Sequence, residues 1–290
     1  MTDVPNPFPA ITARPGRRAF LKTSLGSGFA LAVGPVAAQT IATPATGLVA
    51  GEVKVPVADG TIPAYRAMPA TGGPFPTMLV IHEIFGVHEW ITDVCRRFAR
   101  LGYYAIAPDL YARQGDATKA DIKTIITDIV PKVPDAEVLS DLDATVAFAK
   151  ASGAADTGRL GATGFCWGGR QIWLYAAHNK DMKAAVAFYG LLGGEHAPTS
   201  PNKPKNPVDI GTTITTPVLG LYGGKDENIP EPLIAQMRAE LAEGHSPARI
   251  ELYPDAPHGF FADYRPSYRK PAAEDAWAKA QAWFKQYGVS

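Results

Sequence analysis

Arg159-Leu-Gly-Ala-Thr-Gly-Phe-Cys-Trp-Gly-Gly169 is the stretch of sequence on which the fold assignment depends. Residues 160–165 are small or apolar, as in a buried strand, and residues 171–177 have the composition of a helix. Cys166 lies between them in the pattern G-x-C-x-G, which a nucleophile on a sharp strand-to-helix turn needs, because the flanking backbone is too crowded for a Cβ. A single motif leaves a second interpretation open, in which the Cys is buried and inert and the glycines serve packing.

The composition sets limits on the function. The chain has 290 residues, of which 46% are hydrophobic and 19% charged, as in an ordinary globular protein with a large core. Its formal net charge is zero, which argues against nucleic acid as a partner. It contains two cysteines, too few for a disulfide framework, and no metal-ligand spacing, so we expect no metal.

The N-terminus has the features of a targeting segment. Arg17-Arg18 is followed, after Ala19, by Phe-Leu-Lys and by an apolar stretch over about 25–38, which is too short for a comfortable membrane span. These residues resemble a twin-arginine export signal, with cleavage expected after Ala38. The resemblance implies export by the twin-arginine machinery to the periplasm or the medium, with no membrane anchor after cleavage. Residues 39–50 are rich in Thr, Ala, Pro and Gly and are predicted to be a linker.

Beyond the linker the pattern predicts strands that alternate with helices. Residues 52–57 and 61–68 form a hairpin joined by Asp59-Gly60. Further strands are predicted at 78–81, 103–107, 160–165, 184–189, 218–222 and 249–253, and helices at 89–101, 120–130, 135–151, 171–177, 230–242 and 272–287. Cys95 lies beside an apolar stripe and is expected in the core. Residues 191–215 are predicted to be a long surface loop.

This alternation predicts an α/β fold, with a mostly parallel sheet covered by helices on both faces and an antiparallel hairpin at the N-terminus. No repeat or composition break divides residues 51–290, so we expect one domain. Chemistry collects at the carboxyl ends of the strands in such sheets. The polar residues predicted at those ends are Glu83, Arg113, Cys166, Asp226 and His258.

Three of these residues follow the order of a hydrolase triad. A thiol nucleophile needs a base, and the base needs a third group that orients it. Cys166, Asp226 and His258 occur in the order nucleophile, acid, base, which is that of the α/β-hydrolase fold. Alone, Asp226 could serve only a turn and His258 could be an ordinary loop residue. Their order and their placement at strand ends favour catalysis.

Acyl transfer also needs N–H donors for the oxyanion. The residue after the nucleophile, Trp167, is expected to supply one backbone N–H. The loop that follows the strand at 78–81 is expected to supply the other, from Ile84.

Together these motifs resemble the dienelactone hydrolase family, the carboxymethylenebutenolidase-like cysteine branch of the α/β-hydrolases. The matching stretches are His82-Glu-Ile-Phe-Gly-Val87, Pro108-Asp-Leu-Tyr-Ala-Arg-Gln114, Gly164-Phe-Cys-Trp-Gly-Gly169, Tyr189-Gly190, Gly223-Gly-Lys-Asp226 and His258-Gly-Phe260. The resemblance implies a triad of Cys166, Asp226 and His258 that hydrolyses an ester or lactone through a thioester, without a cofactor.

The resemblance also implies roles for three other residues. Glu83 matches a glutamate that contacts the resting thiol and helps to activate it. Arg113 matches an arginine that binds the substrate carboxylate, and Tyr189 lines the pocket. The family places a second arginine four positions after the His, where this chain has Ala262, and Arg265 lies nearby without matching the motif.

Three other functions remain open at this stage. One is a broader carboxylesterase or thioesterase, and another is a non-catalytic protein that binds a carboxylate ligand on the same scaffold. The third is thiol redox chemistry between Cys95 and Cys166, which the oxidising compartment would permit. The expected partner is a small ester or lactone that bears a carboxylate, and the expected state is a monomer.

Overall fold

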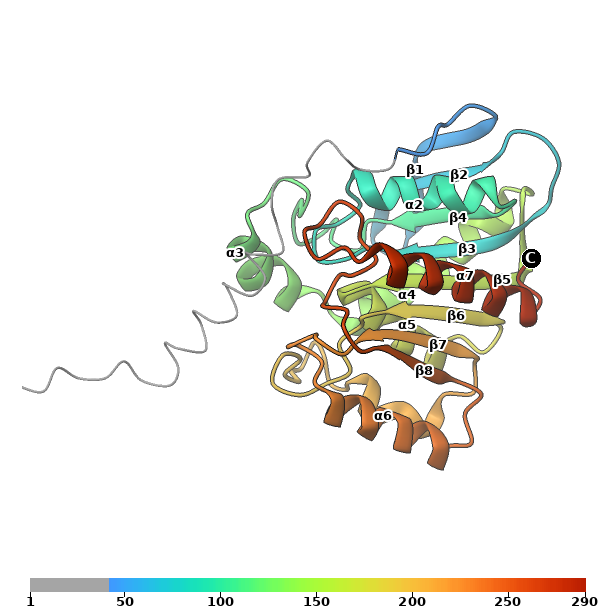
Figure 1. Ribbon diagram of the computed structural model, residues 1–290. Coiled ribbons are helices and arrows are strands. Elements are labelled where there is room, and N and C mark those ends of the chain that lie inside the picture. Colours follow the sequence, from blue (N-terminus) through green and yellow to red (C-terminus); the bar gives the residue numbers. More distant parts are fainter. Residues whose placement is uncertain (1–41) are drawn as a thin grey trace, which may run out of the picture.

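A computed structural model describes residues 42–290 of the chain (Figure 1). The predicted export signal and the first residues of the predicted linker lie outside the described residues. The first strand begins at Leu48, inside the stretch predicted to be a linker, and not at Glu52. No helix within residues 42–290 has the length and the apolar composition needed to cross a membrane.

Eight strands form a single sheet in the order β1-β2-β4-β3-β5-β6-β7-β8. Their bounds are β1 Leu48–Val57, β2 Gly60–Pro69, β3 Phe75–Ile81, β4 Tyr104–Pro108, β5 Ala155–Phe165, β6 Ala184–Phe188, β7 Val218–Gly223 and β8 Arg249–Tyr253. The β1–β2 hairpin and the β2–β4 pair are antiparallel, and every other pair is parallel. Because all strands from β3 onward run the same way, their carboxyl ends share one edge of the sheet.

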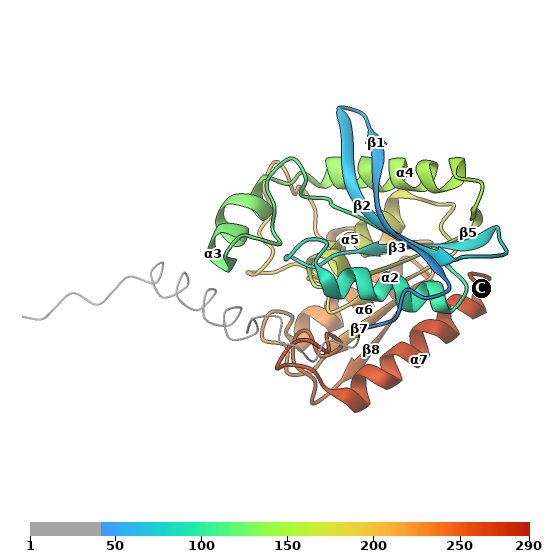
Figure 2. The same cartoon turned by 90° about the horizontal axis from the view of Figure 1, so that it is seen from above.

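Helices cover both faces of the sheet (Figure 2). One face carries α2 (Glu89–Arg100) and α7 (Lys270–Gln286), and the other carries α4 (Asp135–Ala151) and α5 (Trp167–His178). Helix α6 (Glu231–Glu243) packs against β8 and against the 3₁₀ helix η3 (Pro207–Thr213). The predicted α/β-hydrolase fold is confirmed.

Helix α2 illustrates why these segments fold as they do. Its apolar residues recur at helical spacing, and the resulting stripe is buried against the sheet, whereas its arginines lie on the other side. Cys95 is fully buried in this stripe, as expected. Burial raises the pKa of the Cys95 thiol, which makes it inert.

Two predicted segments differ from the structure. The helix predicted at 120–130 is a single turn of α3 (Ile122–Thr124), followed by π-helix η1 (Ile125–Ile129) and 3₁₀ helix η2 (Val130–Lys132). Pro131 lacks the N–H that a regular helix needs there. The loop at 191–215 is also not wholly at the surface, because it contains η3 and buries Leu192 and Ile214 completely.

Candidate active site

Cys166 occupies a strained turn between β5 and α5. Its φ of 54° and ψ of −113° lie outside the regions that residues with a Cβ prefer. Such a conformation costs about 1–3 kcal/mol and persists only where the surroundings enforce it. Here the Cys166 N–H donates to the carbonyl of Phe188 at 3.0 Å, and the Cys166 carbonyl accepts from Arg170 N–H at 3.2 Å. The turn therefore holds the thiol at the carboxyl edge of the sheet.

The flanking glycines are required by the packing of this turn. A Cβ on Gly164 would lie 2.4 Å from the Gly168 carbonyl oxygen, and a Cβ on Gly168 would lie 2.4 Å from the carbonyl oxygen of Ile81. Real Cβ atoms do not approach backbone so closely, so α5 can begin against the end of β3 only with glycine at both positions. This contact also brings Trp167 next to the segment that contains Ile84.

His258 and Asp226 form the second part of the site. Nδ1 of His258 lies 2.7 Å from Oδ2 of Asp226, whose side chain is fully buried at the end of β7. The other oxygen of Asp226 accepts from the backbone N–H of Asn228 at 3.0 Å and from its side-chain amide at 3.2 Å. The carboxylate is therefore held in one orientation, with Oδ2 directed at the imidazole.

His258 also interacts with the thiol. Burial lowers the pKa of His258, but the charges of Asp226 and Cys166 and hydrogen bonds to both outweigh it and raise the pKa to about 10. The structure thus brings Cys166, His258 and Asp226, which are far apart in sequence, into one chain of interactions. The ring of Tyr189 packs edge-on against the imidazole at 5.0 Å and limits its movement.

Glu83 follows β3 and is fully buried in a polar cluster. Its Oε2 lies 2.5 Å from Nη2 of Arg265, and its Oε1 binds Nε2 of His88 at 3.0 Å and accepts from the hydroxyl of Tyr264. Burial raises the pKa of Glu83, but the charge of Arg265 and a hydrogen bond with His88 outweigh it and lower the pKa to about 2. Glu83 is therefore an ion-paired carboxylate, and its contact with the thiol stays a prediction.

Arg265 is a site residue that the family motif does not predict. Two consecutive turns, closed by Ala262 N–H to the Gly259 carbonyl and by Arg265 N–H to the Ala262 carbonyl at 3.0 Å each, fold the loop after His258 back on itself. Ala262 is buried without a polar contact from its side chain, and the guanidinium that reaches Glu83 comes from Arg265. The neighbouring Tyr264 and Arg265 indicate in the sequence that a polar group follows His258. Their spacing alone does not show which residue contacts Glu83.

Arg113 is held by carboxylates of its own. Its Nε and Nη2 bind Asp59 at 2.8 and 2.7 Å, in the turn of the β1–β2 hairpin, and its Nη1 binds Asp141 of α4 at 2.7 Å. Its hydrogen bonds to these carboxylates raise the pKa of Arg113. A substrate carboxylate would have to displace them, so the role of Arg113 in substrate binding stays a prediction.

Two buried tyrosines lie around the thiol. The hydroxyls of Tyr189 and Tyr111 have no hydrogen-bond partner within residues 42–290. Burial raises the pKa of each hydroxyl, and the charge of Cys166 contributes to both shifts. Both groups therefore remain neutral donors close to Cys166. Tyr111 was not predicted, although it lies in the matching stretch 108–114.

The two expected oxyanion donors lie at the same place in the fold. Ile84 is almost completely buried just past β3, and Trp167 is buried at the first position of α5. Free N–H groups at a helix start suit a developing negative charge.

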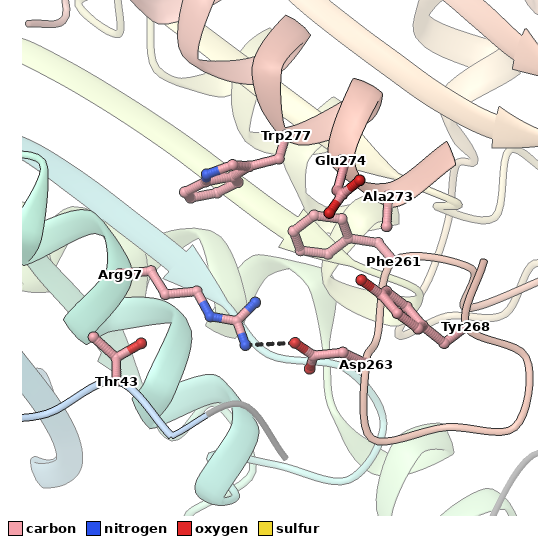
Figure 3. Close-up of a pocket in the computed structure, with 8 residues that line it drawn as sticks. All are labelled: Thr43, Arg97, Phe261, Asp263, Tyr268, Ala273, Glu274 and Trp277. Carbon is pink, nitrogen blue, oxygen red and sulfur yellow. Dashed lines mark hydrogen bonds and ion pairs between the residues drawn. The ribbon is translucent and has the colours of Figure 1, made fainter. Parts of the chain in front are cut away.

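A separate pocket of about 280 Å³ lies between α2, α7 and the loop after His258 (Figure 3). Phe261, Asp263 and Trp277 are among the residues that line it, whereas Cys166, Asp226 and His258 are not. Asp263 accepts from Nε1 of Trp90 at 2.6 Å and from Arg97 at 2.7 Å. These bonds anchor the loop after His258 to α2.

Comparison with known proteins found relatives that match most of this chain. The model of the dienelactone hydrolase family matches residues 62–288. A protein of Methylorubrum extorquens named "Putative carboxymethylenebutenolidase" is 61% identical over 94% of this chain and 94% of its own length. A protein of Escherichia coli with the same name is 51% identical over 92% of this chain and 98% of its own length. The crystal structure of a Klebsiella pneumoniae protein titled "Putative Dienelactone Hydrolase" is 52% identical, covers 83% of this chain and 99% of that one, and superposes with a TM-score of 0.79.

Proposed function

The chain belongs to the dienelactone hydrolase family and is a hydrolase of that type, and from this premise we propose that Cys166 is its nucleophile and acts through a thioester. The observation that carries the proposal is the placement of His258 between Asp226 and Cys166. Because its pKa is raised to about 10, the imidazole holds at neutral pH the proton that it takes from the thiol, and it is protonated when Sγ attacks. Asp226 accepts the Nδ1 proton and leaves Nε2 for Cys166.

The reaction then proceeds in two halves. Sγ of Cys166 transfers its proton to His258 and attacks the acyl carbon, and the carbonyl oxygen becomes an oxyanion that receives the N–H groups of Ile84 and Trp167. When the oxyanion collapses, the ester C–O bond breaks and His258 returns the proton to the leaving oxygen. Water, deprotonated by His258, then attacks the thioester and releases the acid and the thiol.

We propose a carboxylate-bearing lactone as the substrate. Nη1 of Arg265 is buried and has no hydrogen-bond partner in the described part of the chain, although Nη2 pairs with Glu83. A substrate carboxylate that bound Arg265 would compete with Glu83 for the guanidinium. Glu83 released in this way would be free to approach the thiol, in line with its expected role in activation.

Burst kinetics with an activated aryl ester test the nucleophile. We expect one equivalent of alcohol per active site in the burst, with the acyl group on Cys166 by mass spectrometry. Cys166→Ala abolishes the burst and the adduct, whereas Cys95→Ala, which removes the other thiol, keeps both. Turnover retained in Cys166→Ala would contradict the proposal.

A substrate panel separates the remaining functions. Butenolide lactones and simple aryl esters, each with and without a carboxylate, are compared on the wild type, Arg113→Ala and Arg265→Met. A carboxylate preference that Arg265→Met removes supports the lactonase, and equal turnover of all esters supports a broader esterase or thioesterase. Tight carboxylate binding without turnover would indicate a binding protein.

We also propose that residues 1–38 direct export by the twin-arginine machinery. The twin arginine with its Phe-Leu-Lys continuation supports this. A reporter fused after Ala38 should reach the periplasm, and replacing Arg17 and Arg18 with lysine should retain it in the cytoplasm. Export that persists in the lysine variant would contradict the proposal.

A further inference from the structure

His82 is a completely buried imidazole between the end of β3 and Glu83. Its Nε2 lies 3.1 Å from the backbone nitrogen of Leu110, and its Nδ1 lies 2.7 Å from the carbonyl oxygen of Glu83. A backbone N–H can only donate, so Nε2 is the acceptor and the proton is on Nδ1. Burial lowers the pKa of His82 to about 4, so the ring keeps this neutral tautomer at neutral pH.

The bond to the Glu83 carbonyl controls an N–H on the same peptide. The C=O of Glu83 and the N–H of Ile84 belong to one planar unit and point in opposite directions. A donor that holds the carbonyl therefore also sets the direction of the N–H. Gly86 N–H donates to the same carbonyl at 3.1 Å, so His82 and Gly86 together hold the peptide plane.

The same imidazole contacts the residue that carries the second expected oxyanion donor. Its ring is stacked on the indole of Trp167, with centroids 5.2 Å apart and planes inclined by 14°. Tyr111 completes a cluster of three rings, edge-on at 4.7 Å from His82 and 4.7 Å from Trp167. One neutral ring thus touches both segments from which the oxyanion hole would be built.

We infer that His82 is a positioning residue that sets the placement of the Ile84 and Trp167 N–H groups relative to each other. This inference rests on the proposed hydrolase function, because it assigns His82 a role in stabilising the oxyanion of that reaction. His82 acts through the two peptides and exchanges no proton with the substrate. It is therefore distinct from His258.

Two substitutions separate the hydrogen bond from the packing. The substitution His82→Phe keeps a ring against Trp167 and loses both hydrogen bonds. Asn keeps an N–H at the position of Nδ1, and so can still donate to the Glu83 carbonyl, but loses the ring. We expect His82→Phe to lower the acylation rate by about 10²-fold, in the range seen when one oxyanion donor is lost, and His82→Asn to recover about a tenth or more of the wild-type rate.

The readout compares an aryl ester with its thionoester, in which sulfur replaces the carbonyl oxygen. A sulfur anion gains little from N–H donors placed for oxygen, so damage to the oxyanion hole lowers the rate for the ester far more than that for the thionoester. Rates are divided by the burst amplitude, which counts active molecules. We expect His82→Phe to lower kcat with little change in KM and no shift in the pH profile.

The inference is supported if the ester-to-thionoester ratio falls in His82→Phe and recovers in His82→Asn. It is overturned if His82→Phe keeps the wild-type ratio, or if both variants lose ester and thionoester turnover equally. If His82→Phe does not fold, His82→Asn alone decides the test. A wild-type ester-to-thionoester ratio in His82→Asn supports the inference. A ratio lowered by about 10²-fold overturns it, because the hydrogen bond to the Glu83 carbonyl is then not enough to place the N–H groups. Failure of the proposed function is a separate result, namely a burst that persists in Cys166→Ala.

Discussion

Arg265 pairs with Glu83 in an ion pair that is shielded from solvent, with Nη2 2.5 Å from Oε2 and 1% and 0% of the two side chains exposed. The pair ties the loop after His258 to the end of β3, next to the expected oxyanion segment. It also holds Glu83 as a charged carboxylate at the end of β3. Glu83 lies early and Arg265 late in the described residues. The loop after His258 must therefore pack against the end of β3 before the ion pair can form.

Loss of either member should therefore be costly. Arg265→Met leaves a buried carboxylate without its cation, and we expect a loss of about 3–5 kcal/mol in the free energy of unfolding, measured in urea. The double variant Arg265→Met, Glu83→Gln should recover much of that loss, because no charge is then stranded.

A surface pair provides the control. Lys119 binds Asp116 at 2.7 Å with both side chains exposed, and such pairs contribute little to stability. Lys119→Met should therefore change stability little. A comparable loss in Lys119→Met and Arg265→Met would contradict the assignment of the Glu83 pair as the stabilising one.

Asp226→Asn tests the orientation of the base. The Asn side chain is nearly isosteric and the fold should be retained, but an amide no longer compels the proton onto Nδ1 of His258. In the serine proteases the equivalent change costs about 10⁴ in kcat, and we expect a loss of about 10³–10⁴ here. Single-turnover acylation measures it, and unchanged acylation would rule out a role for Asp226 in catalysis.

The stability of the protein should fall at alkaline pH through His258. Burial lowers its pKa, but Asp226 and Cys166 raise it to about 10, above the usual value of 6.5. The folded state therefore binds the proton more tightly than the unfolded state, and the stabilisation is complete below about pH 6.5 and is lost as the pH rises through 10. Urea unfolding of His258→Gln should show a shallower decline between pH 6.5 and 10 than the wild type. Parallel declines would show that His258 is not the group responsible.

The strained turn between β5 and α5 that carries Cys166, called the elbow below, should not tolerate a methyl group on its glycines. Gly164→Ala places a Cβ 2.4 Å from backbone, and we expect at least the loss of about 1–3 kcal/mol typical of overpacking, together with loss of the burst. Gly51→Ala is the matched control, because a Cβ there has nothing within 4 Å and needs no positive φ. Thermal unfolding and burst amplitude compare the two, and equal effects would show that the elbow is not tightly packed.

Much of the fold could be predicted from local patterns. Helix α4 has the predicted bounds, 135–151, because its apolar periodicity is continuous along the chain. The region 120–132 could not be predicted as well, since Pro131 and tertiary contacts divide it into three short helical types. Tyr111 and His82 belong to the site because their rings pack against Trp167 and because His82 binds backbone groups. These contacts form through space, so the local sequence around each residue could not predict them.

The sequence by itself determined the elbow, the chain order of Cys166, Asp226 and His258, and the alternation that makes a parallel sheet, because each depends on spacing along the chain. Only the tertiary structure decided which residue forms the ion pair with Glu83 and which carboxylates bind Arg113. A loop that turns twice makes Arg265 the partner of Glu83, although motif spacing pointed to position 262. Electrostatic pairing depends on distances through space, and those are settled only when the loops pack on the finished sheet.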